Sequence, residues 1–190
     1  DASFRSLLVA RLLIGSGMAS FGFFAVFGTR RFDLDVEHIG LLAPILLISQ
    51  TVANLASGFL NDRIGAIGLT IAGAAITPIA ALIAFVATDP IALYPIFILV
   101  GFSQAAFVMA DLTLILDTAP NDQMPTYLAT YSAAVYPVLI GASAIAGVII
   151  DVVGFKPMFL LSASLGLIGI GLMVRVARSR TVSNTTKLYG

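Results

Sequence analysis

Six apolar stretches follow one another along this chain of 190 residues and limit its fold more than any other feature. They cover approximately residues 4–28, 38–60, 66–87, 91–116, 126–150 and 157–177. A helix of about 20 residues crosses a hydrocarbon core of roughly 30 Å. The stretches are continuously apolar rather than alternating, which favours helices over barrel strands. We therefore predict an all-α integral membrane bundle of six transmembrane helices.

The composition points the same way. Hydrophobic residues make up 59% of the chain, charged residues 11%, and the mean hydropathy is +1.04. An ordinary soluble domain is about 25% charged, so this chain has too few polar side chains to cover a water-exposed surface. We expect a lipid bilayer around it. Ten basic residues balance ten acidic ones, which excludes the basic footprint of a nucleic-acid-binding protein.

The distribution of basic residues predicts the orientation. An even number of spans places both termini on one side of the membrane. Six basic residues fall on that side, namely Arg5, Arg63, Arg175, Arg178, Arg180 and Lys187, and three fall on the other, namely Arg30, Arg31 and Lys156. This excess favours cytoplasmic termini. We predict a transmembrane domain over residues 1–178 and a polar, disordered cytoplasmic tail over residues 179–190.

The segment Gly58-Phe59-Leu60-Asn61-Asp62-Arg63-Ile64-Gly65 forms a predicted tight turn between the second and third spans. Gly58 would let a neighbouring helix approach closely, and Gly65 can adopt a positive φ. Asp62 would lie near the membrane surface, where it can accept hydrogen bonds from the first amides of the fifth span. We interpret the segment as a gate that holds one conformation; the alternative is a simple turn with a surface ion pair.

With this segment the chain resembles one half of a major facilitator superfamily transporter. The signature between the second and third helices of that family reads Gly-x-x-x-Asp-Arg-x-Gly, and Gly58, Asp62, Arg63 and Gly65 match it in type and spacing. Ala66 and Ile67 stand where the family has basic residues. Residues 117–127 and 141–154 are similar to the C-terminal half of bacterial members.

The resemblance implies a fold, partners and a place in the cell. The fold would be one half of a twelve-helix facilitator, paired with an N-terminal six-helix half in a bacterial inner membrane. Its function would be symport or antiport of a small-molecule substrate by alternating access, without a cofactor.

Two ionisable residues lie inside predicted spans, where charges are expensive and usually face a partner or an aqueous cavity. Arg11 lies about 10 Å past Phe4, and Asp111 lies about 8 Å before Leu116, so the two share a similar depth. The resemblance implies that their spans, the first and the fourth, line the central cavity. We interpret Arg11 and Asp111 as a cavity or gate pair, with Asp111 a candidate proton site. The alternative is that Arg11 reaches the interface and Asp111 serves local packing.

Gln104 is the best candidate for a substrate contact, because an amide both donates and accepts hydrogen bonds. The alternative is that it bridges two helices, a role that Gln50 and Asn54 of the second span fit better than substrate binding. The other polar residues of the cavity spans are Ser16, Ser20, Ser103 and Thr113. Four phenylalanines crowd the outer end of the first span, namely Phe21, Phe23, Phe24 and Phe27. They would form an apolar outer gate or a substrate-facing wall, or else serve lipid contact and packing.

The sequence does not indicate an enzyme. It contains no cysteine, and its one histidine, His38, lies in a predicted loop beside Asp35 and Glu37. We find no nucleophile with a base, no metal-ligand spacing and no phosphate-binding loop. Because the chain begins with Asp1, we expect it to be part of a longer transporter. The alternative is a stand-alone six-helix membrane protein that associates with itself or serves a partner without transport.

Overall fold

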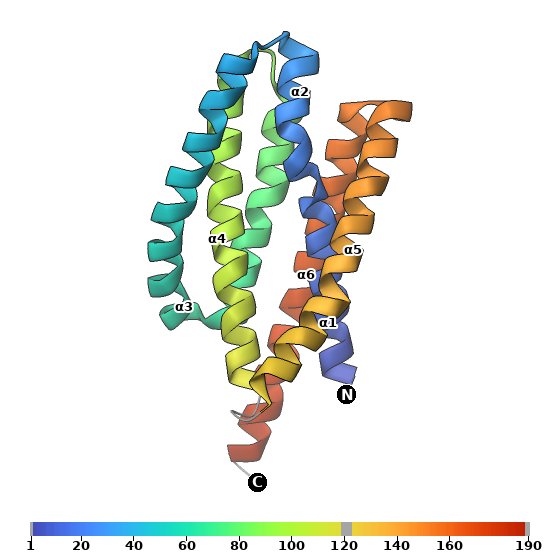
Figure 1. The fold of residues 1–190 in the computed structure, drawn as a ribbon. Coiled ribbons are helices and arrows are strands. Elements are labelled where there is room, and N and C mark those ends of the chain that lie inside the picture. Colours follow the sequence, from blue (N-terminus) through green and yellow to red (C-terminus); the bar gives the residue numbers. More distant parts are fainter. Residues whose placement is uncertain (1, 119–122, 189–190) are drawn as a thin grey trace.

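The computed structural model describes residues 2–118 and 123–188, and all regular structure within those ranges is helical. The elements are α1 (Ala2–Gly17), η1 (Met18–Gly22), α2 (Phe23–Phe32), α3 (Val36–Val86), η2 (Pro90–Ala92), α4 (Leu93–Thr118), α5 (Met124–Val153) and α6 (Phe155–Leu188). Figure 1 shows an elongated bundle with both chain ends at the same end of the molecule. Five of the described segments are long and apolar enough to cross a membrane. The predicted all-helical class is confirmed, whereas the predicted count of six separate helices is not.

The difference in number comes from α3, which contains 51 residues. A straight helix of that length would measure about 75 Å, more than twice the hydrocarbon thickness of roughly 30 Å. The helical backbone breaks only at Gly65, where φ is 71° and ψ is 172°. Figure 1 shows the ribbon turning back at this end of α3, so that its two arms run in opposite directions. The sequence predicted a turn over residues 58–65, but only Gly65 is non-helical. It separates α3 into two arms, the first over residues 36–64 and the second over residues 66–86.

The first span is also interrupted. The sequence predicted one helix over residues 4–28, but α1 ends at Gly17, the 3₁₀ segment η1 follows, and α2 continues to Phe32. Gly17 and Gly22 flank the change of helix type, and glycine is a poor helix former. Within η1 the Ser20 hydroxyl donates to the Gly17 carbonyl at 3.2 Å. This span therefore consists of two α-helical pieces joined by a tighter turn.

The last helix runs further than expected. α6 continues to Leu188, whereas the sequence predicted a disordered tail over residues 179–190. The prediction rested on polar composition, which lowers the tendency to form a packed core. Extending an existing helix by one residue is much easier than starting a new one. The backbone of residues 179–188 accordingly carries on the helix of the last span, and the domain boundary at residue 178 stays a prediction.

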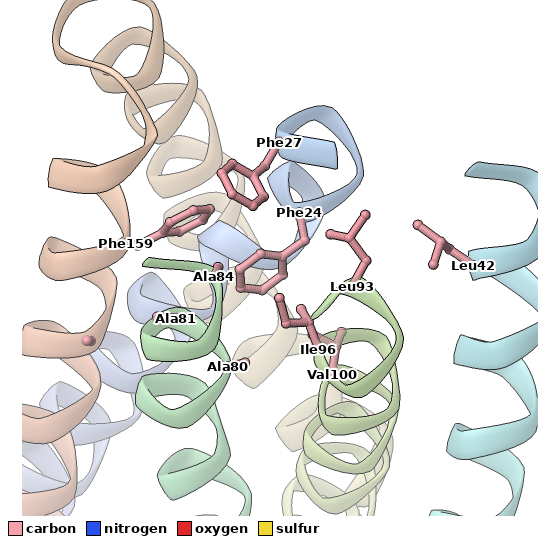
Figure 2. Close-up of a cluster of buried hydrophobic side chains, with 11 residues drawn as sticks. Phe24, Phe27, Leu42, Ala80, Ala81, Ala84, Leu93, Ile96, Val100 and Phe159 are labelled. Atoms are coloured by element: carbon pink, nitrogen blue, oxygen red, sulfur yellow. The ribbon is translucent and has the colours of Figure 1, made fainter. Parts of the chain in front are cut away.

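The largest buried cluster joins α2, α3, α4 and α6 near the end of the bundle that lies opposite the termini (Figure 2). The Phe24 ring stacks on Phe159 with centroids 5.2 Å apart. The Phe27 ring meets the same Phe159 edge-on at 5.3 Å. Phe24 is fully buried and Phe27 is nearly so. Of the three interpretations of these phenylalanines, packing is the one confirmed for Phe24 and Phe27.

Helix α4 packs closely against both arms of α3. A Cβ added at Gly101 would lie 2.9 Å from the Leu46 carbonyl oxygen, and one added at Gly73 would lie 2.9 Å from the Ala106 Cβ. The buried Ser103 hydroxyl donates to the Gly73 carbonyl at 2.9 Å. Small residues allow such close approach in lipid, where packing and interhelical hydrogen bonds drive association.

Helix α5 is packed far less. Within the most apolar 18 residues of each helix, 17% of the α5 residues are buried, compared with 50% of those of the α4 span. Two of its contacts with the rest of the bundle involve glycines: Leu139 lies over Gly15 of α1, and Gly147 faces the ring of Phe23. Most of the α5 surface is therefore free to contact lipid or another polypeptide.

Candidate functional site

Arg11 of α1 and Asp111 of α4 form the ion pair that the sequence suggested. The Arg11 Nε donates to Asp111 Oδ1 at 2.9 Å, and Nη2 donates to Oδ2 at 2.6 Å. The Arg11 side chain is 6% exposed and the Asp111 side chain 23%. This bidentate geometry is the strongest arrangement that arginine and a carboxylate adopt. Arg11 is thus buried inside the bundle, which contradicts the alternative that it reaches the interface.

An aromatic ring supports the pair from α4. The Arg11 Cζ lies 4.5 Å from the centroid of the Phe107 ring, close enough for a cation–π attraction. Phe107 precedes Asp111 by four residues and therefore lies one turn away on the same side of α4. The helical spacing thus presents a ring and a carboxylate to the same guanidinium.

Two polar atoms beside the pair are buried and make no hydrogen bond to any described residue. They are Arg11 Nη1 and the hydroxyl of Tyr131 on α5. The Tyr131 hydroxyl interacts electrostatically with both Arg11 and Asp111. Leaving such donors unpaired in a buried site costs about 1–3 kcal/mol each. The Tyr131 hydroxyl thus lies beside the ion pair and interacts with both of its charges.

Tyr131 was not among the residues that the sequence suggested. A depth argument could have identified it, because Tyr131 lies about 10 Å from Met124 at the start of α5. Asp111 lies about 10 Å from Thr118 at the facing end of α4. Equal depth was the signal for Arg11 and Asp111, and it applies equally to this tyrosine.

Gln104 lies seven residues before Asp111 on α4, which places it on the same side of that helix about 10 Å away. Its Oε1 accepts from Gln50 Nε2 of α3 at 3.4 Å. Gln50 thus takes the bridging role expected of it, and Gln104 takes part in the same bridge. Asn54, the other expected bridging residue, is exposed.

The four signature residues lie around the break in α3. Gly65 has the positive φ that the sequence predicted. Gly58 does not mark a close helix approach, since a Cβ there would come no nearer than 3.9 Å to Met109. Asp62 and Arg63 are exposed. Among the residues that the structure describes, neither forms an ion pair.

The expected contact between Asp62 and the start of α5 is not present in this conformation. The amides of Thr126 and Tyr127 donate to the Gln123 carbonyl instead, at 3.0 and 3.1 Å. Asn61, next to Asp62, makes a contact that the sequence did not suggest: its Nδ2 donates to Thr113 Oγ1 of α4 at 3.1 Å. The first arm of α3 is thereby tied to α4 rather than to α5.

The hydroxyl groups of the cavity spans bond to backbone carbonyls. Ser16 donates to Leu12 at 2.9 Å and Thr113 donates to Met109 at 3.0 Å, each within its own helix. Such bonds are the usual role of hydroxyls in membrane helices. Within residues 2–118 and 123–188, no group of three or more His, Cys, Asp or Glu side chains is placed to hold a metal ion.

Comparison with known families identifies the chain. A search of curated proteins finds no match. The sequence model of the Major Facilitator Superfamily matches residues 7–188, which is nearly the whole chain and includes Arg11, Asp111 and the four signature residues. The chain therefore belongs to the Major Facilitator Superfamily, as its resemblance to that family predicted.

Proposed function

We propose that this chain is one half of a secondary active transporter that moves a small solute across a bacterial inner membrane by alternating access. Its family shows membrane transport in general. The observation that carries the more specific proposal is the buried Arg11–Asp111 pair, which links α1 to α4 beside α5. Buried ion pairs add little to stability, and ionisable residues inside a membrane protein usually have a functional role.

The arrangement of the helices supports six crossings. The two arms of α3 run in opposite directions, so they count as two crossings, and with the other four long segments the chain would cross six times. Both chain ends lie at the same end of the bundle in Figure 1, as an even number requires. The excess of basic residues at that end favours a cytoplasmic location for both termini. Most of the α5 surface is exposed, and we propose that it packs against the N-terminal six-helix half.

Asp111 would couple transport to protons. In the described conformation Arg11 neutralises it through two hydrogen bonds. A proton on Asp111 would remove the charge that holds Arg11, and the freed guanidinium would bind an acceptor elsewhere, such as a solute or the Tyr131 hydroxyl. If the solute and the proton occupy the site together, the transport is symport. If they occupy it in turn, the transport is antiport.

Gln104 would contact the solute from the same side of α4. Its Oε1 is engaged by Gln50, while its Nε2 donors make no hydrogen bond to the described residues. A solute lying between Gln104 and Asp111 would thus meet an amide donor at one end and the charged pair at the other. A small polar molecule fits this spacing, which is about 10 Å along α4.

Uptake by the intact native polypeptide, reconstituted into vesicles with an imposed pH gradient, tests the coupling role. We expect Asp111→Asn to abolish the stimulation of uptake by the gradient, because an amide cannot exchange a proton. Asp151→Asn is the matched control, since Asp151 forms only an exposed ion pair with Arg30. Unchanged stimulation in Asp111→Asn would remove Asp111 from the coupling mechanism. A mass of the native polypeptide close to that of this chain alone would contradict the half-transporter proposal.

The signature residue Asp62 would act in the other conformation of the cycle. It is exposed here, and the first amides of α5 bond to Gln123. We propose that Asp62 accepts from those amides when the cytoplasmic end closes. Asp62→Asn should then lower the uptake rate while insertion into the membrane stays normal. Asp35→Asn, just before the opposite end of the first α3 arm, should leave the rate unchanged. Equal rates for both variants would show that the turn has no gating role.

A further inference from the structure

Three amide side chains lie together halfway along the contact between α3 and α4. They belong to Gln50 and Asn54 of the first α3 arm and to Gln104 of α4, and we call these three residues the amide face. Gln50 lies about 21 Å from each end of its arm over residues 36–64. Gln104 lies about 17 Å from the start of α4 and about 21 Å from its end. The amide face therefore lies near the middle of the hydrocarbon core.

Most hydrogen-bonding groups of the amide face are free. One bond joins two of its members, since Gln50 Nε2 donates to Gln104 Oε1 at 3.4 Å. Gln104 Nε2, Gln50 Oε1 and both polar atoms of the Asn54 side chain make no hydrogen bond to the described residues. Asn54 is exposed and the two glutamines are partly exposed. A molecule beside the bundle can therefore reach all three side chains.

The two sides of the first α3 arm differ in polarity. An amide that lacks a hydrogen-bond partner is costly in hydrocarbon, and polar side chains at membrane depth usually face a partner or water. Val52 and Phe59 lie about 140–160° round the helix from Asn54. They are 53% and 75% exposed, and their side chains carry no polar atom. The side with Val52 suits lipid, whereas the amide face requires a hydrogen-bonding neighbour.

The chemistry of the amide face indicates what that neighbour is. The face carries no charge, and the charge of Asp111, seven residues after Gln104, is already paired with Arg11. An amide offers a donor and an acceptor side by side. A solute hydroxyl also donates and accepts, whereas a carboxylate only accepts and an ammonium group only donates. Several amides in a row thus match a neutral molecule with several hydroxyls better than they match an ion.

We propose that the amide face binds a neutral solute with several hydroxyl groups, namely a sugar or a polyol. Gln104, Gln50 and Asn54 each exchange hydrogen bonds with a different hydroxyl of that solute. The inference rests on the proposed transport function, because the bound solute is the one transported. It names the chemical class of the solute and adds two residues of α3 to the contact made by Gln104.

Thiol labelling tests whether the amide face is open to water. Residues 1–190 contain no cysteine, so single cysteines can be introduced into the intact native polypeptide after any cysteine outside this range is changed to serine. Leu47→Cys lies two turns before Asn54 on the same side of its arm, and Val108→Cys lies one turn after Gln104. Val52→Cys is the matched control on the apolar side. The three native side chains are 60%, 63% and 53% exposed. In phosphatidylcholine vesicles, a water-soluble maleimide should label the first two thiols at least about tenfold faster than the control.

Solutes are then tested for protection of the two reactive thiols. The panel contains glucose, xylose, sorbitol and inositol as neutral polyhydroxy compounds, succinate as an anion and putrescine as a cation. We expect at least one polyhydroxy compound to slow the labelling of both thiols about fivefold, and the two ions to have no effect. Protection by an ion only, or by no compound, would overturn the proposal. Labelling of both thiols as slow as that of Val52→Cys would also overturn it, because a partner helix or lipid would then cover the amide face.

Variants connect the protection to the amides. Asn54→Leu, combined with Leu47→Cys, should raise the protecting concentration about threefold to tenfold through lost hydrogen bonds. Thr51→Val is the matched control and should have no effect, because the exposed Thr51 hydroxyl already donates to the Leu47 carbonyl at 2.8 Å. Gln104→Leu replaces Asn54→Leu if the latter fails to insert. An unchanged protecting concentration in the leucine variant would overturn the role of the amides.

Protection needs no pH gradient and no turnover, so its failure differs from a failure of the proposed function. Uptake without protection by any polyhydroxy compound would contradict the amide-face proposal and leave the transport proposal intact. Protection without uptake would support the binding site and contradict transport by this chain.

Discussion

Helices α4 and α5 are neighbours in the chain but are held by different means. α4 is joined to α3 by side-chain hydrogen bonds from Ser103, Gln50 and Asn61, and by glycines that bring the backbones together. α5 is held mainly by apolar contacts, and its Tyr131 hydroxyl makes no hydrogen bond to the described residues. In lipid, where apolar surface gains little by burial in protein, helices without polar or close backbone contacts are weakly fixed. The difference indicates a rigid α3–α4 layer and an α5 that adapts to what surrounds it.

The largest effect should come from breaking the ion pair that links α4 to α1. Asp111→Ala leaves the nearly buried Arg11 charge without its partner, which costs about 3–5 kcal/mol of unfolding free energy. Thermal unfolding in micelles should show a loss of several degrees. The double variant Arg11→Leu with Asp111→Leu should recover most of the loss, because an apolar pair of similar volume is tolerated there. A single variant as stable as the native chain would show that Arg11 has another acceptor.

A glycine comparison tests the close packing of α4 against that of α5. Gly101→Ala forces a methyl group against the Leu46 carbonyl and should cost about 1–3 kcal/mol through overpacking. Gly141→Ala on α5 meets nothing within 4 Å and should be neutral or slightly stabilising, since alanine favours helix. Unfolding temperatures of the two variants in the same detergent measure the difference. Equal losses would mean that α5 is as tightly packed as α4.

A hydroxyl comparison should give a smaller effect. Ser103→Ala removes a buried hydrogen bond and should cost about 1 kcal/mol. Tyr131→Phe removes a buried hydroxyl that makes no hydrogen bond to the described residues and should change stability less than Ser103→Ala does. The measurement is again the unfolding temperature. Destabilisation by Tyr131→Phe of the same size as by Ser103→Ala would show that the tyrosine hydroxyl is bonded in the folded protein.

The smallest effect is expected at the other end of the bundle, where Arg30 of α2 donates to Asp151 at the end of α5 at 3.1 Å. Both side chains are more than half exposed. Arg30→Gln should therefore cost less than about 1 kcal/mol, and added salt should reduce even that difference. The free energy of unfolding of Arg30→Gln and of the native chain, measured at low and at high ionic strength, tests this expectation. A large, salt-independent loss would mean that this pair fixes α5 to α2.

The sequence predicted the helical membrane class, the approximate extent of the apolar segments and the contact between Arg11 and Asp111. The class and the extent of the segments follow from local hydrophobicity. The contact follows from the depth of each residue in the membrane, which its position along its own helix determines. The Asn61–Thr113 bond and the role of Tyr131 were not predicted. They depend on how neighbouring helices rotate about their axes, and that rotation is set by packing of many small side chains at once.

Helix boundaries failed for a different reason. The sequence placed the break in α3 across eight residues because polar and charged side chains there suggested a turn. The backbone needed only Gly65, since helical conformation tolerates Asp62 and Arg63 where they are solvated and Asn61 where it bonds to Thr113. In the first span, continuous apolarity concealed the 3₁₀ segment, because hydrophobicity reports burial and not the pitch of the helix.

That short segment has a mechanical consequence. Met18–Gly22 comprises five residues in a 3₁₀ helix, which rise about 10 Å, whereas five α-helical residues rise about 7.5 Å. The piece before it is anchored on α6 through Ile14 and Gly169, and the piece after it is anchored by Phe24 on Phe159. A change of η1 to α-helical pitch would draw those two anchors together by about 2.5 Å. The pitch of this segment therefore sets the distance between the two anchors of the first span.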